Sequence, residues 1–99
     1  MDGRMKIVLN CASADVKKSK ILPEHCREVS NLFVVYPYRK KGRARALMEK
    51  ICKRADSMGH VLVIAVTDNV LLPFYKSLGF IEIQQTPIII MARGQYGRS

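Results

Sequence analysis

The order of apolar segments in the middle of the chain limits the fold more than any other feature of the sequence. Arg27 to Val35 alternates and ends in a β-branched and aromatic run, as a buried strand does. Between Gly42 and Gly59 the apolar residues recur at intervals of three and four, which predicts an amphipathic helix, and they are Ala44, Leu47, Met48, Ile51, Cys52 and Ala55. Val61 to Val66 is continuously apolar, as in a strand covered on both faces. This strand, helix, strand run predicts a parallel pair joined by a crossover, with Leu32 and Val63 on neighbouring strands.

Length and composition limit the number of domains and the class of protein. The chain has 99 residues, enough for one domain and not for two, and its 48% hydrophobic and 25% charged content is ordinary for a globular protein. Met5 to Leu9 predicts a short strand, whereas Asn10 to Pro23 is polar and turn-rich. The three cysteines are odd in number and lack C-x-x-C spacing, so neither a disulfide framework nor a zinc ribbon is indicated. No apolar run reaches the length of a signal-peptide core or of a membrane span. We expect a single soluble domain over residues 1–99, cytoplasmic, with reduced thiols.

The last third of the chain predicts a second helix and a hairpin. Asp68 or Asn69 is suited to cap that helix, and Pro73 is tolerated in its first turn, where backbone amides lack helical partners. The remaining segments predict two antiparallel strands and a frayed basic tail, at residues 80–83, 88–91 and 94–99.

The charge balance points to an anionic partner. Lys and Arg number 17 against 8 Asp and Glu, which leaves a formal net charge of +9. Nucleic acid, an acidic membrane face and a phosphate-bearing cofactor would each be attracted by this charge, so the positions of the basic residues have to decide among them.

The segment from Arg39 to Ala44 lies between the first buried strand and the amphipathic helix. A diphosphate needs several amides that point one way, and a tight turn that leads into a helix N-terminus supplies them. Gly42 removes a Cβ that would block close approach, Ala44 keeps the next position small, and positive charge comes from Lys40, Lys41 and Arg43. The alternative interpretation is a solvated basic turn, which is common at helix starts.

Two motifs carry a family resemblance. Arg39, Gly42 and Ala44 match the pattern (Arg or Gln)-x-x-Gly-x-(Gly or Ala), and Phe74 to Phe80 is similar to the pattern Tyr-x-x-x-Gly-Phe. With these motifs in this order, the chain resembles the GNAT superfamily of acetyl-CoA-dependent N-acetyltransferases over about residues 28–91. The resemblance implies an α/β fold of the GNAT type, a mixed sheet with a splayed parallel strand pair flanked by helices.

The resemblance also implies a site for acetyl-CoA. Backbone groups at the end of the first buried strand would pair with the pantetheine arm as an added strand does. Amides from Lys40 through Arg45 would hold the pyrophosphate. Asn69 stands near the sequence position at which the family has an asparagine that contacts the cofactor. The implied cofactor-binding residues are Leu32, Phe33, Val34, Arg39, Lys40, Lys41, Gly42, Arg43, Ala44, Arg45 and Asn69.

Two catalytic candidates follow from the same resemblance. Tyr75 matches the tyrosine that protonates the departing thiolate, and its alternative role is a helix tyrosine that packs on the sheet. Glu28 stands eleven positions before Arg39, as the glutamate base of histone-type members does, although an exposed strand-start glutamate is an equally good interpretation and water is an alternative base. The amide of Phe33 or Val34 is the implied oxyanion donor.

No metal site is expected, because His25 and His60 are isolated from each other and from any ligand spacing. The sequence is interpreted as an N-acetyltransferase that moves an acetyl group from acetyl-CoA to a primary amine in a ternary complex. In the family, helices and strands that build the acceptor pocket precede the resemblance, and here 27 residues stand in their place. A protein lysine or N-terminus as acceptor, or a second subunit, would supply the missing wall. The alternatives are a non-catalytic acetyl-CoA-binding module and a small basic nucleic-acid-binding protein.

Overall fold

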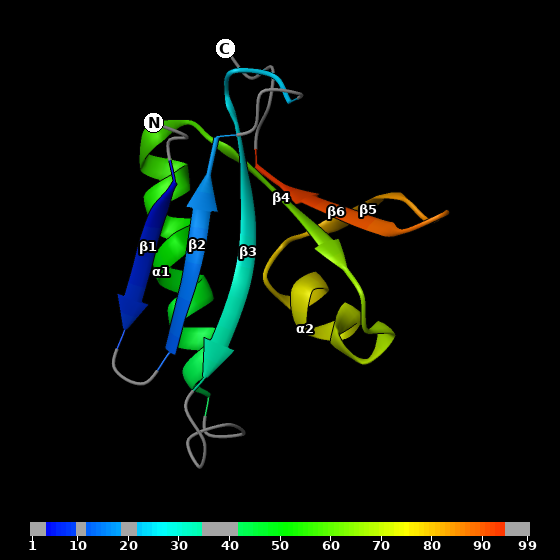
Figure 1. Ribbon diagram of the computed structural model, residues 1–99, viewed down its shortest axis with the longest axis horizontal. Helices are drawn as coiled ribbons and strands as arrows, with labels where there is room; N and C mark the ends of the chain where they lie inside the picture. Colours follow the sequence, from blue (N-terminus) through cyan, green and yellow to red (C-terminus); the bar gives the residue numbers. More distant parts are fainter. Residues whose placement is uncertain (1–3, 10–11, 19–21, 35–41, 95–99) are drawn as a thin grey trace.

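A six-stranded mixed sheet is the centre of the fold, shown by a computed structural model in Figure 1. The structure describes residues 4–9, 12–18, 22–34 and 42–94. The strands lie in the order β1-β2-β3-β4-β6-β5 and comprise β1 (Met5–Leu9), β2 (Ala12–Lys17), β3 (Cys26–Val34), β4 (Val61–Val66), β5 (Ile81–Gln84) and β6 (Ile89–Arg93). The helices are α1 (Arg43–Met58), the short 3-10 helix η1 (Asn69–Leu71) and α2 (Leu72–Ser77). Within the described sheet β3 and β4 are the parallel pair, which confirms the predicted crossover.

Helix α1 forms where its periodicity predicts it. Gly42 precedes it with φ 73°, and Gly59 ends it with φ 71°, a left-handed conformation that suits glycine. At this end the amides of Gly59 and His60 donate to the carbonyls of Asp56 and Ala55, at 3.3 and 2.9 Å. The buried face comprises Leu47, Met48, Ile51, Cys52 and Ala55, which are five of the six residues of the predicted apolar stripe.

Both helices pack on one face of the sheet. In β4, Leu62, Ile64 and Val66 are buried and belong to the same apolar core as the buried face of α1. Tyr75 of α2 and the following Phe80 join this core, so α2 lies on the same side as α1. The described elements leave the opposite face without a helix, and there the side chains of Ile81 and Ile83 are exposed.

Strand β2 corrects the prediction of a polar, turn-rich segment from Asn10 to Pro23. Ala12 and Ala14 are 2% and 1% exposed in the core, whereas Asp15 is buried and lies 3.9 Å from the guanidinium of Arg4. Ala, Ser and Asp have low strand propensity, but pairing with both β1 and β3 holds this segment extended. The pattern of small residues gave too weak a signal because tertiary contacts decide the conformation here.

The C-terminal elements confirm their prediction to within a residue or two. The carboxylate of Asp68 accepts a hydrogen bond of 3.0 Å from the amide of Val70, so Asp68 caps η1. Helix α2 follows with Leu71 at its N-cap and no side-chain cap, and Pro73 lies in its first turn. Strands β5 and β6 pair antiparallel as the predicted hairpin. In the described part of the chain, no helix combines the length and apolarity that a membrane crossing needs. The predicted tail beyond Gly94 lies outside the described residues.

Candidate active site

Strands β3 and β4 form a V. They are paired only over Cys26 to Glu28 and Val61 to Val63. Beyond this point β3 continues to Val34 beside β2, whereas β4 continues to Val66 beside β6, and Figure 1 shows the two strands diverging. Within the described sheet, the β4-facing edge of β3 after Glu28 therefore has no strand partner. An extended ligand can pair with this edge through backbone hydrogen bonds.

A β-bulge lies in the diverging part of β3. Ser13 pairs with Phe33 and Asp15 pairs with Ser30, so two residues of β3 face Ala14 alone in β2. A bulge leaves one backbone unit out of the ladder and turns it aside. The predicted pantetheine residues Leu32, Phe33 and Val34 lie at or just after this bulge, and the side chain of Leu32 packs against the core.

The N-terminus of α1 lies at the open end of the V. Gly42 has a left-handed backbone, and no atom of the described residues beyond its chain neighbours lies within 4 Å of where its Cβ would be. The first turn of α1 contains no acidic residue and Gly42 offers no side-chain cap, so nothing from those residues competes with an anion. Arg43 and Ala44 begin the helix and are partly exposed. The predicted Arg39, Lys40 and Lys41 lie outside the described residues.

Arg45 has a role that the sequence did not indicate. Its Nη2 donates a hydrogen bond of 2.5 Å to the hydroxyl of Ser77, and its guanidinium lies 5.4 Å from the centre of the Phe74 ring. The Ser77 hydroxyl in turn donates to the carbonyl of Phe74 at 2.6 Å. The Arg45 side chain thus joins the first turn of α1 to α2, while its backbone amide lies in the turn that the sequence predicts as the phosphate site. No sequence signal marks a pair that is 32 residues apart.

Two further contacts fix the end of α2. Nε of Arg93 donates to the carbonyl of Leu78 at 2.6 Å, and its two terminal nitrogens contact the Asp56 carboxylate at 2.8 and 3.2 Å. Lys76 forms an ion pair of 2.9 Å with Glu82 of β5. The hydrogen bond from Lys76 is the main reason why the pKa of Glu82 is lowered. Helix α2 is therefore held by α1, β5 and β6 together.

Tyr75 projects from α2 into the core. It is 4% exposed, and its ring makes edge contacts with Phe74 and Phe80 at centroid distances of 5.2 and 5.7 Å. Among the described residues no hydrogen bond involves its hydroxyl. Burial raises the pKa of the Tyr75 phenol, so it is protonated at neutral pH and can act as a proton donor. The packing role and the donor role are both compatible with this position.

Glu28 lies at the vertex of the V. It is the last residue of β3 that pairs with β4, opposite Val63, and it is partly exposed. The neighbouring Val29 is buried in the core on the helix side, so Glu28 is on the open face. Glu28 and Tyr75 therefore lie on opposite sides of the sheet.

The remaining candidates have less defined surroundings. Asn69 is exposed at the start of η1, beside its cap residue Asp68. Burial raises the pKa values of the Cys26 and Cys52 thiols, which disfavours the nucleophilic thiolate. In residues 4–9, 12–18, 22–34 and 42–94, no three His, Cys, Asp or Glu side chains lie close enough together to hold a metal ion.

Comparison with known proteins agrees with this geometry. The family model described as "Acetyltransferase (GNAT) domain" matches residues 9–88, most of the chain. No curated protein sequence gave a match.

Solved structures of similar fold include three N-acetyltransferases. The ribosomal-protein-S18-alanine N-acetyltransferase from Escherichia coli is 24% identical over 85% of this chain and 61% of its own, with a TM-score of 0.71. A GCN5-related N-acetyltransferase from Kribbella flavida is 24% identical over 86% and 60%, with a TM-score of 0.71. The PaiA N-acetyltransferase from Thermoplasma acidophilum, solved in complex with coenzyme A, is 18% identical over 86% and 54%, with a TM-score of 0.68. The chain thus spans between 54 and 61% of the length of these three proteins. With a splayed parallel strand pair, a glycine-led helix at its open end and a family match across most of its length, the chain belongs to the GNAT acetyltransferase family.

Proposed function

We propose that this protein binds acetyl-CoA in the V and transfers the acetyl group to a primary amine within a ternary complex. The observation that carries the proposal is the free edge of β3 beyond Glu28, bounded at one end by the vertex and at the other by the N-terminus of α1. A pantetheine arm is a peptide-like chain that pairs with such an edge. Amides in the first turn of α1 are suited to hold the pyrophosphate.

The chemistry requires one proton to leave the amine and one to reach the sulfur. Attack by the neutral amine forms a C–N bond and breaks the C–S bond of the thioester. We assign proton donation to sulfur to the Tyr75 phenol, because it is protonated at neutral pH and matches the tyrosine of the Tyr-x-x-x-Gly-Phe pattern. Glu28, or a water molecule beside it, would accept the amine proton. Tyr75 and Glu28 lie on opposite sides of the sheet, so a thioester in the V would have the proton donor on one side and the proton acceptor on the other.

For the acceptor we favour a protein lysine or N-terminus. The described elements leave the Glu28 face of the sheet without a covering helix, so a protein segment has room to approach the vertex. This face also holds an apolar groove of about 600 Å³ beside the vertex, lined in part by Val63, Ile81, Ile83 and Ile90. A macromolecular acceptor has enough surface to fill such a groove, whereas a small amine would leave it open.

Two glycines provide a matched test of cofactor binding. Gly42 and Gly59 lie at opposite ends of α1, and both have φ near 70°. At both, the described residues leave open space at the Cβ position. Gly42→Asp places a carboxylate where the pyrophosphate would bind, so we expect acetyl-CoA to lose its effect on the melting temperature. Gly59→Asp adds the same charge at a comparable backbone site and should retain the full shift. Equal shifts in the two variants would contradict the assignment of the phosphate site.

Turnover and acceptor class need a second experiment. The protein is incubated with labelled acetyl-CoA and a cell lysate, and labelled amines are identified by mass spectrometry, with Gly42→Asp as the background. Labelled lysines or N-termini that are absent from the background support the proposal. Acetyl-CoA binding without labelling would favour a non-catalytic binding module. Binding to nucleic acid that falls steeply with salt and ignores CoA would favour the nucleic-acid alternative.

A further inference from the structure

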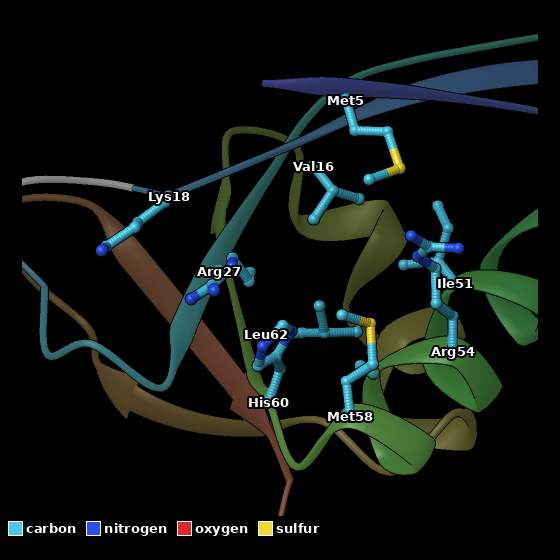
Figure 2. A pocket seen from close by; sticks show the side chains of 10 residues that line it. Met5, Val16, Lys18, Arg27, Ile51, Arg54, Met58, His60 and Leu62 are labelled. Atoms are coloured by element: carbon cyan, nitrogen blue, oxygen red, sulfur yellow. The ribbon is translucent and has the colours of Figure 1, made fainter. Parts of the chain in front are cut away.

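A second pocket lies at the closed end of the V, on the helix side of the sheet. It has a volume of about 250 Å³, close to the lower limit of ordinary ligand pockets. Its apolar walls come from three strands and α1, and Figure 2 shows several of these side chains around one space: Met5, Val16, Ile51, Met58 and Leu62, with Ala55 completing the wall. Met5 and Met58 are 43% and 52% exposed and form the mouth. Flexible thioether side chains at a mouth adapt well to an alkyl chain.

Among the described residues, every titratable side chain that lines this pocket is basic: Lys18, Arg27, Arg54 and His60. Lys18 forms an ion pair with Glu24, and in Figure 2 it points away from the apolar space. Arg27 donates to the carbonyls of Glu24 and Cys26 at 2.7 and 2.9 Å, so its guanidinium is anchored by neutral groups. In the part of the chain that the structure describes, neither Arg27 nor Arg54 makes an ion pair.

The pKa of His60 is affected by this positive charge. Burial is the main cause of its lowered pKa, and the charges of Arg27 and Arg54 lower it further. Of the nearby carboxylates, Asp56 contacts Arg93 and Glu24 contacts Lys18, and the charge of Glu24 also attracts Arg27. The C-terminal carbonyls of α1 at Asp56 and Ala55 are also occupied, by the amides of Gly59 and His60. An anion at the mouth would therefore meet Arg54, which has no ion-pair partner among the described residues, and a partly compensated Arg27.

The pocket is separate from the V. Its helical residues come from the C-terminal half of α1, whereas the phosphate end of the proposed cofactor site lies at Gly42. The 16 residues of α1 extend over about 24 Å at 1.5 Å per residue. Arg27 and Glu28 are consecutive in β3, so their side chains point to opposite faces of the sheet. The pocket, which Arg27 lines, therefore lies on the other side of β3 from the Glu28 side chain.

We propose that this pocket binds a small anionic amphiphile, an alkyl carboxylate whose chain fills the apolar space and whose carboxylate is attracted by Arg27 and Arg54 on either side of it. At about 30 Å³ for each water-sized group, 250 Å³ accommodates a chain of about eight carbons. Apolar walls select the alkyl chain and the two guanidinium groups select the negative charge. A neutral or cationic amphiphile gains only the first of these interactions.

Sodium octanoate is the probe, followed by amide chemical shifts in the full-length protein with saturating coenzyme A present. We expect saturable shifts at residues 51–62 and 27, no displacement by coenzyme A, and at least tenfold weaker binding of octylammonium. Arg54→Gln should weaken octanoate binding about threefold, whereas Lys53→Gln, one position along the same helix, should leave it unchanged. Met58→Glu should abolish binding by placing a carboxylate at the mouth, and Ser57→Glu should not.

Several results would overturn the proposal. One is octylammonium binding as tightly as octanoate, which would show that the basic residues do not select the ligand. Another is equal weakening by Arg54→Gln and Lys53→Gln, which would reveal a general charge effect. Shifts confined to residues 30–34 and 42–45 would place the octanoate in the V instead of the pocket.

Discussion

Replacing Tyr75 by phenylalanine separates the packing role of this residue from its role as a proton donor. The side chain is 4% exposed, and its ring contacts with Phe74 and Phe80 do not involve the hydroxyl. No described residue forms a hydrogen bond with that hydroxyl, so its loss leaves no protein partner unsatisfied. We therefore expect the free energy of unfolding of Tyr75→Phe to stay within about 1 kcal/mol of the wild-type value.

The rate of acetyl transfer should respond differently. A positioned general acid contributes about 100 to 10,000-fold, so kcat should fall by that factor, which corresponds to about 2.7 to 5.5 kcal/mol of activation free energy. The dissociation constant for acetyl-CoA should change less than about twofold, because no binding group is removed. Release of the free thiol measures kcat, calorimetric titration measures binding, and urea unfolding measures stability. A kcat within about threefold of the wild-type value, with binding and stability intact, would refute Tyr75 as the acid.

The pH dependence provides an independent check on the same residue. Burial raises the pKa of Tyr75 in the folded protein above its unfolded value of about 10. The folded state therefore binds this proton more tightly, and the stability it contributes is complete below pH 10 and is lost as the pH rises through the folded pKa. Tyr75→Phe should lose less stability than the wild type above pH 10. Identical alkaline unfolding curves would show that the phenol is not desolvated as the structure indicates.

Three other substitutions test the surroundings of the site. The Cβ of Gly42→Ala meets no atom of the described residues within 4 Å but the backbone keeps φ 73°, so the substitution should cost about 1 to 2 kcal/mol in urea unfolding. Gly94→Ala combines φ 142° with a Cβ 2.9 Å from the Cα of Val61, so it should be the more destabilising of the two glycine substitutions, by at least about 1 kcal/mol. Ser77→Ala removes the contact of α2 with Arg45 and should lower kcat several-fold with little change in the KM for acetyl-CoA, as expected for a positioning residue. An unchanged kcat would mean that the other contacts of α2 suffice to hold Tyr75.

Local periodicity made the central part of the fold predictable. The apolar stripe of α1 and the run from Val61 to Val66 both bury the faces that their patterns indicate, and together they imply the parallel pair. Strand β2 was not predictable, since Ala12 and Ala14 are extended only because β1 and β3 pair on either side. The start of α1 after Gly42, where we propose that the pyrophosphate binds, was also predictable from the sequence. The contact of Arg45 with Ser77 could not be predicted, because it depends on how two helices meet on the sheet.

The net charge of +9 has a more specific meaning once the fold is known. Two arginines, Arg43 and Arg45, lie in the first turn of α1, and two others, Arg27 and Arg54, line the pocket near its last turns. A nucleic-acid backbone would need a continuous basic stripe, because it places a phosphate every few ångströms. These two arginine clusters, one beside an open strand edge and one beside an apolar cavity, suit two compact anions that each carry an extended chain. Acetyl-CoA at the first cluster and an alkyl carboxylate at the second should consequently bind together without competing, although both should weaken as salt screens the arginines.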